Sequence, residues 1–281
     1  MTLSPVLTFN DGNTIPQLGY GVWQVEDDVA EKVVVQAFEA GFRHIDTAKI
    51  YGNEAGVGRA IERSGLTPEE IFITTKLWNA DQGYESTLKA FEESMERLGL
   101  ETLDLYLIHW MQPKQDKYVD TWKALIELQK QGRVKTIGVS NFTQEGLQRL
   151  IDETGVVPAI NQVELHPFFN QAELREFNAS KGILTQAWSP LGQGGELLES
   201  PVIGQIAAKH GATPAQVVIA WHLAIGNVVI PKSVTESRIR ENYAALDVSL
   251  DETDVQAING LDNSAEGAGR IGPDPAVSDF A

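Results

Sequence analysis

The chain has 281 residues, of which 42% are hydrophobic and 22% charged, and its formal net charge is −17. This composition is ordinary for a globular protein, and the length is close to the roughly 250 residues of one (β/α)8 barrel. The acidic balance disfavours nucleic acid and anionic membranes as partners, because both attract basic surfaces. The absence of cysteine excludes disulfides, thiolate catalysis and cysteine-ligated zinc.

The first residues, MTLSPVLTFNDGN, contain no basic segment followed by an apolar core. We therefore expect no secretory signal and a cytoplasmic location. The longest apolar stretches, such as VVIP and LYLI, are far shorter than the roughly 20 residues that cross a bilayer. We expect one domain over residues 1–281, no membrane segment and a monomeric chain.

Strand-like and helix-like patterns alternate along the chain, which predicts a parallel sheet wrapped by helices. Before them, VLTFNDGNTIPQL has the composition of a β-hairpin with its turn at residues 10–13. The expected strands cover residues 19–22, 43–45, 72–75, 103–108, 134–139, 160–163, 183–187 and 228–230. The expected helices cover residues 28–40, 55–63, 83–98, 120–130, 144–152, 171–180 and 214–224, with a last helix at 237–245.

These eight βα units predict a (β/α)8 TIM barrel, an α/β fold whose bottom the hairpin would close. The segment 187–201 is too long for an ordinary βα loop and contains three glycines, so we expect a mobile functional loop there. The tail from residue 262 is rich in Gly, Pro and Ala. We expect it to be extended and to cover the mouth of the barrel.

Polar side chains that can take part in proton transfer follow three successive strands. RHIDTAKIY contains Asp46 and Tyr51, FITTK ends in Lys76, and LDLYLIHW contains His109. Each of these residue types alone is more often a surface or core group. Because barrel active sites lie at the carboxyl ends of the strands, however, all four should converge on one mouth.

A tyrosine near a lysine and a carboxylate suits the reduction of a carbonyl group. The phenol would donate a proton to the oxygen while hydride reaches the carbon. Lys76 would lower the pKa of Tyr51 from its ordinary value of about 10. Asp46 would orient Lys76, and His109 would bond the substrate oxygen.

Other enzyme classes fit less well. A Rossmann dehydrogenase needs G-x-G-x-x-G between a strand and a helix, and the glycine pairs at 19 and 21 and at 192 and 194 both lack the third glycine. No tyrosine has a lysine four residues later, which argues against the short-chain dehydrogenase arrangement. The five histidines form no paired ligand motif, so we predict catalysis without a metal.

Several motifs, in order from about residue 7 to 261, resemble segments of the aldo-keto reductase family. GFRHIDTAKIYGNEAGVGRAI at 41–61 resembles the family's first signature, and IPKSVTESRIREN at 230–242 resembles its third. GVSNF, INQVELHP and AWSPLGQG are similar to further segments. The resemblance implies a barrel with an N-terminal β-hairpin and a C-terminal loop over the mouth. It also implies NADPH/NADP+ as cofactor and a catalytic tetrad of Asp46, Tyr51, Lys76 and His109.

The same resemblance implies a set of cofactor-binding residues. The expected contacts are Ser140, Asn141 and Gln162 with the nicotinamide carboxamide, Trp188 with its ring, Ser189, Leu191 and Gln193 with the pyrophosphate, Lys232, Ser233 and Arg238 with the adenosine 2′-phosphate, and Glu241 and Asn242 with the adenine. Residues 232–240 contain three basic side chains and one acidic side chain. Such a local excess of positive charge suits a phosphate dianion within an acidic chain.

Within the family, the chain resembles the short bacterial members similar to 2,5-diketo-D-gluconate reductases. This implies reduction of small aldehydes, ketones or α-dicarbonyls in a pocket lined by Trp23, Tyr51, His109 and Trp110, with the tail GAGRIGPDP closing over it. The short C-terminal segment lacks the specificity determinants of the steroid- and sugar-reducing animal members. The alternative is an NADPH-binding regulatory barrel subunit with little turnover, since some barrels of this family type are known mainly as partners of channels.

Overall fold

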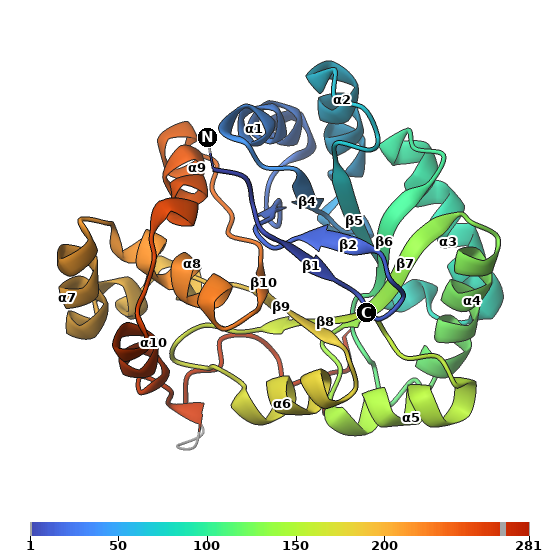
Figure 1. The fold of residues 1–281 in the computed structure, drawn as a ribbon. Coiled ribbons are helices and arrows are strands. Elements are labelled where there is room, and N and C mark those ends of the chain that lie inside the picture. Colours follow the sequence, from blue (N-terminus) through green and yellow to red (C-terminus); the bar gives the residue numbers. More distant parts are fainter. Residues whose placement is uncertain (1, 265–267, 281) are drawn as a thin grey trace.

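The computed structural model describes residues 2–264 and 268–280. Its main sheet has eight parallel strands, each paired with the next along the chain. They are β3 (Tyr20–Gly21), β4 (His44–Asp46), β5 (Phe72–Leu77), β6 (Leu103–Ile108), β7 (Val134–Ser140), β8 (Ile160–Glu164), β9 (Leu184–Trp188) and β10 (Val228–Val229). Leu18 forms a parallel bridge with Val229, and the N–H of Gly19 donates to the Val229 carbonyl at 2.8 Å. The sheet therefore closes into the predicted barrel (Figure 1).

Helices follow the strands and surround the sheet (Figure 1). They are α1 (Asp27–Ala40), α2 (Glu54–Ser64), α3 (Tyr84–Leu98), α4 (Tyr118–Lys130), α5 (Gln144–Thr154), α6 (Ala172–Ser180), α7 (Pro201–His210), α8 (Pro214–Ala224), α9 (Glu236–Tyr243) and α10 (Glu252–Asn259). The expected strands and helices are all present, with ends within about two residues of the prediction.

The sequence analysis did not predict α7 and α10. Helix α7 begins with Pro201 and contains Gly204, and both residue types are more typical of loops than of helices. Proline is nevertheless favourable in the first turn of a helix, where its missing N–H has no intrahelical partner. Helix α10 is only 8 residues long, and a capping box between Asp251 and Asp254 starts it.

The N-terminal hairpin closes the bottom of the barrel, as expected. Its strands β1 (Val6–Thr8) and β2 (Thr14–Pro16) pair antiparallel. The amide of Asn10 donates to the Pro158 carbonyl at 3.1 Å, and the amide of Asn13 donates to the Lys135 carbonyl at 3.1 Å. Both acceptors lie at the amino ends of strands. The mouth at the carboxyl ends is therefore left to the loops and the tail, and the hairpin lies in front in Figure 1.

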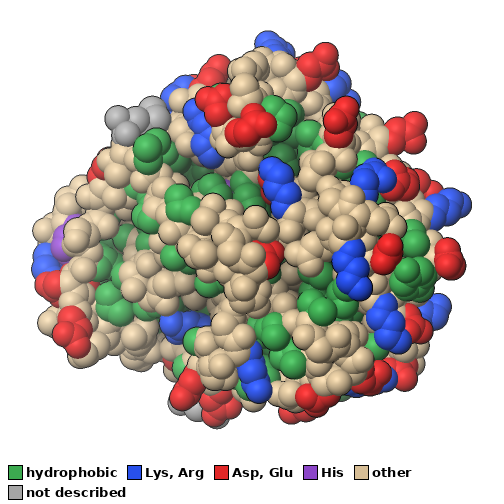
Figure 2. Space-filling view, turned by 45° about the vertical axis from the view of Figure 1, so that its right-hand side comes forward, with side chains coloured by type: hydrophobic (Ala, Val, Ile, Leu, Met, Phe, Trp, Pro, Cys, Tyr) green, Lys and Arg blue, Asp and Glu red, His purple; other side chains and the backbone are tan. Residues whose placement is uncertain are grey.

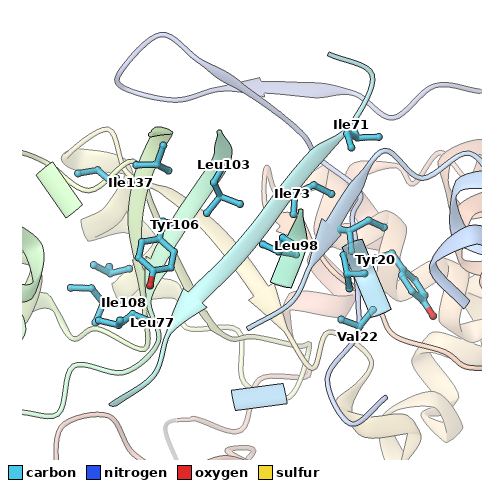
Figure 3. Close-up of a cluster of buried hydrophobic side chains, with 14 of the residues drawn as sticks. Tyr20, Val22, Ile71, Ile73, Leu77, Leu98, Leu103, Tyr106, Ile108 and Ile137 are labelled. Carbon is cyan, nitrogen blue, oxygen red and sulfur yellow. The ribbon is translucent and has the colours of Figure 1, made fainter. Parts of the chain in front are cut away.

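The strands pack on both faces because successive side chains point to opposite sides of a sheet. In β6, Leu105 and Leu107 lie inside the barrel with Phe9 and Phe72. Tyr106 belongs to the larger cluster between sheet and helices, where its ring meets that of Phe91 in α3 at a centroid distance of 5.1 Å. Figure 3 shows this outer cluster.

One face of the molecule shows how the surface charges are distributed. On the face in Figure 2, acidic and basic side chains are interspersed rather than gathered into a field of one sign. Among the described residues, no helix is both long and apolar enough to span a membrane.

The interior of the barrel is too close-packed to admit one extra methyl group at Gly138 in β7. A Cβ there would lie 2.8 Å from the backbone oxygen of Ile160. We expect Gly138→Ala to lower the free energy of unfolding by about 1–3 kcal/mol, because the backbone at Ile160 must move to make room. The matched control is Gly204→Ala in α7, which meets nothing within 4 Å. It should stabilise the helix by about 0.5–1 kcal/mol. Thermal midpoints at one scan rate would check the pair, and a Gly138→Ala protein as stable as wild type would contradict the packing.

Candidate active site

The period of two along each strand directs the predicted site residues into the barrel. Lys76 lies four residues after Phe72, whose side chain is inside, and His109 lies two residues after Leu107. Every second side chain also points inward on the other strands. The inward positions nearest the carboxyl ends there include Asp46, Ser140, Gln162 and Trp188. Parallel strands end at the same edge, so these side chains share one mouth.

A buried ion pair lies at the centre of this mouth. Nζ of Lys76 donates to Oδ1 of Asp46 at 2.5 Å, and the two side chains are 0% and 2% exposed. Nζ also donates to the Thr47 carbonyl at 2.9 Å and to the Tyr51 hydroxyl at 3.5 Å. An ammonium has three N–H groups, so all three have an acceptor. The second oxygen of Asp46 accepts from the Gln162 amide at 2.7 Å.

Tyr51 is presented by a short 3₁₀ turn, η1 (Lys49–Tyr51), directly after β4. Lys49 fixes this turn from outside, with Nζ 2.8 Å from Asp81 and 3.3 Å from Glu93. The rings of Tyr51 and His109 meet edge to face at a centroid distance of 5.7 Å. Because Tyr51 accepts from Lys76, its own proton is free to be donated toward the mouth.

Burial is the largest influence on the pKa values of Lys76, Tyr51 and His109. Burial disfavours the charged form of Lys76, but the Asp46 charge, the Tyr51 oxygen and the hydrogen bonds to both together outweigh it and raise the pKa of the ammonium. Burial also raises the pKa of Tyr51, and the opposing Lys76 charge does not cancel that rise. The expected net lowering of the Tyr51 pKa is therefore wrong for the free protein. Burial and then the Lys76 charge lower the pKa of His109 well below its ordinary value. The site thus holds a neutral phenol and a neutral imidazole near pH 7.

Four of the predicted cofactor residues join the tetrad in one hydrogen-bond network. Nε1 of Trp188 donates to Oδ1 of Asn141 at 2.8 Å, and the Asn141 amide donates to the His109 carbonyl at 2.9 Å. The hydroxyl of Ser140 donates to the backbone oxygen of Gln162 at 2.8 Å. Since Gln162 also bonds Asp46, the residues predicted to hold the nicotinamide lie directly beside those predicted to act on the substrate.

The residues predicted for the rest of the cofactor lie on the rim formed by the β9 loop and α9. Ser189 and Gln193 have φ of +48° and +57°, and the latter is in the 3₁₀ turn η3 (Gly192–Gly194). A second 3₁₀ turn, η4 (Glu196–Glu199), follows, so much of the expected loop 187–201 has regular structure. Leu191 is half-buried against the core.

Charge is distributed unequally over the α9 rim. Among the described residues, Lys232 and Arg238 are exposed and form no ion pair, whereas Arg240 lies 3.0 Å from Glu236. Ser233 and Asn242 are buried. The carboxylate of Glu241 accepts from the Thr213 hydroxyl at 2.7 Å, which fixes its direction.

Aromatic side chains wall the mouth, and two of them were not predicted. Trp23 is 44% exposed at the rim, whereas Trp110 is buried under the ring of Phe280, at a centroid distance of 5.0 Å. Trp78, two residues after Lys76, lies 5.3 Å from the His109 ring and 6.1 Å from Phe280. The strand-end pattern that revealed Lys76 could also have revealed Trp78. No local pattern could have revealed Phe280, since it is a lone aromatic residue near the end of the tail.

The tail covers the mouth over the described part, residues 268–280. Gly267, which belongs to the predicted segment GAGRIGPDP, lies outside the described residues.

His166 packs within its own loop, where Nε2 lies 3.2 Å from the Glu164 carboxylate.

Comparison with known proteins identifies the family. The model of the Aldo/keto reductase family matches residues 16–263. The chain belongs to the aldo/keto reductase family. An aldo-keto reductase of Mycolicibacterium smegmatis is 54% identical over 278 residues, with 99% of each chain covered. The methylglyoxal reductase DkgA of Salmonella typhimurium is 52% identical over 271 residues, with 96% of each chain covered.

A solved structure of a Gox0644 variant in complex with NADPH superposes with a TM-score of 0.94 at 52% identity. The superposition covers 99% of this chain and 100% of that chain. The family and the barrel fold predicted from the sequence motifs are confirmed, and the chain is an enzyme of the aldo-keto reductase class.

Tyr51→Phe tests whether Tyr51 is the proton donor, as the sequence predicts. The substitution keeps the ring against His109 and removes only the hydroxyl, so kcat should fall by at least the ~10²-fold typical of lost general acid catalysis. Cofactor affinity should change little. Tyr84→Phe, on a partly exposed side chain at the start of α3, is the matched control. A Tyr51→Phe enzyme that reduces aldehydes at the wild-type rate would remove Tyr51 from the chemistry.

The protonation states predict a flat pH profile for reduction. If Tyr51 donates the proton and His109 binds the carbonyl oxygen, the active forms are the neutral phenol and the neutral imidazole. The lowered His109 pKa and the raised Tyr51 pKa move both titrations outward from their ordinary values. With a neutral aldehyde, kcat/KM should stay constant between about pH 6.5 and 10 and fall above that range, as Tyr51 loses its proton. A tenfold change centred near pH 7 would contradict these assignments.

Proposed function

We propose that this reductase uses NADPH to reduce small aldehydes, ketones and α-dicarbonyls to alcohols, with Tyr51 as proton donor. The observation that carries the proposal is the buried Lys76–Asp46 pair, which directs its remaining N–H to the Tyr51 oxygen. Bound NADPH would supply the hydride to the carbonyl carbon. Tyr51 would give its proton to the carbonyl oxygen, and the product is an alcohol.

His109 and Lys76 would act on different oxygens, His109 on that of the substrate carbonyl and Lys76 on that of Tyr51. The neutral His109 imidazole can donate one hydrogen bond to the substrate carbonyl and so fix its direction. Lys76 stabilises the negative charge that develops on the Tyr51 oxygen as the proton leaves. Asp46 would act only through Lys76, by keeping the ammonium charged and in place.

The residues present fit the cofactor at both of its ends. The network of Trp188, Asn141, Ser140 and Gln162 offers one aromatic face and polar groups beside the tetrad. At the other end, Lys232 and Arg238 are exposed and free of ion pairs within residues 2–264 and 268–280, which suits the adenosine 2′-phosphate. The related Gox0644 variant is named as an NADPH complex.

The substrate range is proposed from the closed mouth. Phe280 packs against Trp78 and Trp110, and Trp78 lies against the His109 ring, so three large rings occupy one side of the mouth and favour a compact substrate. The relative DkgA is named a methylglyoxal reductase, in agreement with a compact dicarbonyl. We also propose that the chain works as one domain, as a monomer in the cytoplasm and without nucleic-acid partners, and its net charge of −17 supports the last point.

Arg238→Ala tests the preference for NADPH. A charge-assisted bond of about 1.5–3 kcal/mol implies a loss of roughly ten- to a hundredfold in NADPH affinity, with little change for NADH. Arg240→Ala on the same helix is the matched control, because Arg240 already pairs with Glu236. Fluorescence titration at low salt would measure all Kd values. Equal wild-type affinities for the two cofactors would refute the assignment.

A substrate panel tests the proposed range. Methylglyoxal, 2,5-diketogluconate, benzaldehyde and a ketosteroid would be compared at two ionic strengths. We expect kcat/KM for the compact dicarbonyls to exceed that for the ketosteroid by at least about tenfold, since only compact carbonyls reach both Tyr51 and His109. Added salt should favour the anionic substrate relative to neutral ones. A clear advantage for the ketosteroid would overturn the range, and tight NADPH binding without turnover would favour a regulatory subunit.

A further inference from the structure

The described tail, residues 268–280, crosses the mouth as a strap that is fastened at both ends. At its start, the backbone N–H groups of Ile271 and Gly272 donate to the carboxylate of Glu164, at 2.5 and 2.7 Å. Near its other end, Phe280 packs between Trp78 and Trp110. The Asn79 amide donates to the Phe280 carbonyl at 2.9 Å. The strap therefore depends on a few identifiable bonds rather than on regular secondary structure.

Glu164 is an unusual residue to find at this place. It ends β8, is 2% exposed, and has both carboxylate oxygens bonded to the strap, with His166 as a further neighbour at 3.2 Å from Oε1. Burying a carboxylate is costly unless it is hydrogen-bonded. The strap supplies two of its bonds, so the carboxylate and the strap stabilise each other's position.

The contact between Glu164 and the strap lies beside Trp188, the residue expected to stack on the nicotinamide ring. Glu164 and Trp188 are register partners on β8 and β9. Gly272 packs so closely on the Trp188 ring that a Cβ on Gly272 would lie 2.5 Å from Cη2. Nε1 of Trp188 is held by Asn141, so the ring is fixed between the strap and the polar network. A single carboxylate thus joins the wall of the substrate pocket to the cofactor side of the site.

We propose that Glu164 is a positioning residue for the reduction. Its carboxylate latches the strap, which keeps Gly272 on the edge of Trp188 and Phe280 over the substrate. The proposal rests on the proposed function, because it assigns the strap to substrate capture. Glu164 has no part in proton transfer, so its loss should weaken substrate binding and leave the chemical step nearly unchanged.

Glu164→Gln is the first test, because the amide keeps the shape and loses one of the two acceptors. We expect KM for methylglyoxal to rise about tenfold while kcat stays within about threefold of wild type. Trypsin cleavage after the exposed Arg270 reports the latch without turnover, because the next N–H is one that Glu164 binds. Cleavage there, followed by mass spectrometry, should accelerate about tenfold, as proteolysis tracks the open population.

Phe280→Ala removes the contacts with Trp78 and Trp110 that hold the other end of the strap. It should also raise KM and the cleavage rate and leave kcat nearly unchanged. If both residues act through one strap, the double variant should exceed the larger single effect on KM by no more than about twofold. Val277→Ala is the control on the same strap, since its side chain is 65% exposed. It should change neither KM nor cleavage.

Unchanged KM and unchanged cleavage in Glu164→Gln and Phe280→Ala would overturn the latch. A fall in kcat with normal cleavage would also overturn it, because Glu164 would then act on the reacting groups. If Glu164→Gln does not fold, Phe280→Ala alone decides in the same way. A wild-type enzyme without turnover would refute the proposed function, whereas the cleavage rates would still decide whether Glu164 holds the strap.

Discussion

A lysine ammonium and an aspartate carboxylate face each other at the carboxyl ends of neighbouring strands, almost without contact with solvent. Removing one partner of such a pair costs roughly 3–5 kcal/mol, because it leaves an uncompensated buried charge. The surrounding groups therefore have to satisfy both ions. The Thr47 carbonyl and the Gln162 amide do so, and the remaining N–H of Lys76 is directed to Tyr51. The position of Tyr51, the proposed proton donor, is a consequence of how this ion pair is bonded.

The barrel supplies the constraint that makes such a pair possible. A period of two along each strand sends Asp46, Lys76 and Gln162 inward at the same edge, where three neighbouring or facing strands end. The loops and the tail then supply the remaining side chains of the mouth. The turn that carries Tyr51 is held by Lys49 from outside, and Glu164 fastens the tail that closes the mouth. Rigid strand ends thus carry the charged groups, and tethered loops carry the aromatic walls.

The sequence contained most of the fold and the centre of the site, because both depend on local patterns. Alternating βα periodicity predicted every barrel strand, and the polar residues after three strands predicted the cluster around Lys76. Features that depend on contacts distant in sequence were missed. Helix α7 contains Pro201 and Gly204, two residue types typical of loops, but its Ile203 and Ile206 pack in one buried cluster with Trp221 of α8. Phe280 lies about 170 residues from Trp110 in the sequence, and the net direction of the Tyr51 pKa depends on burial that no motif encodes.

The most direct test of the central role of the ion pair is the single-turnover rate of NADPH oxidation in Lys76→Met and in the double variant Asp46→Asn/Lys76→Met. If Asp46 acts only through Lys76, the single variant should be slower by at least about 10²-fold and the double variant equally slow. The double variant should also be more stable than Lys76→Met, because the unpaired buried carboxylate is gone. A double variant slower than Lys76→Met by a further large factor would give Asp46 an independent role in the chemistry and contradict the account.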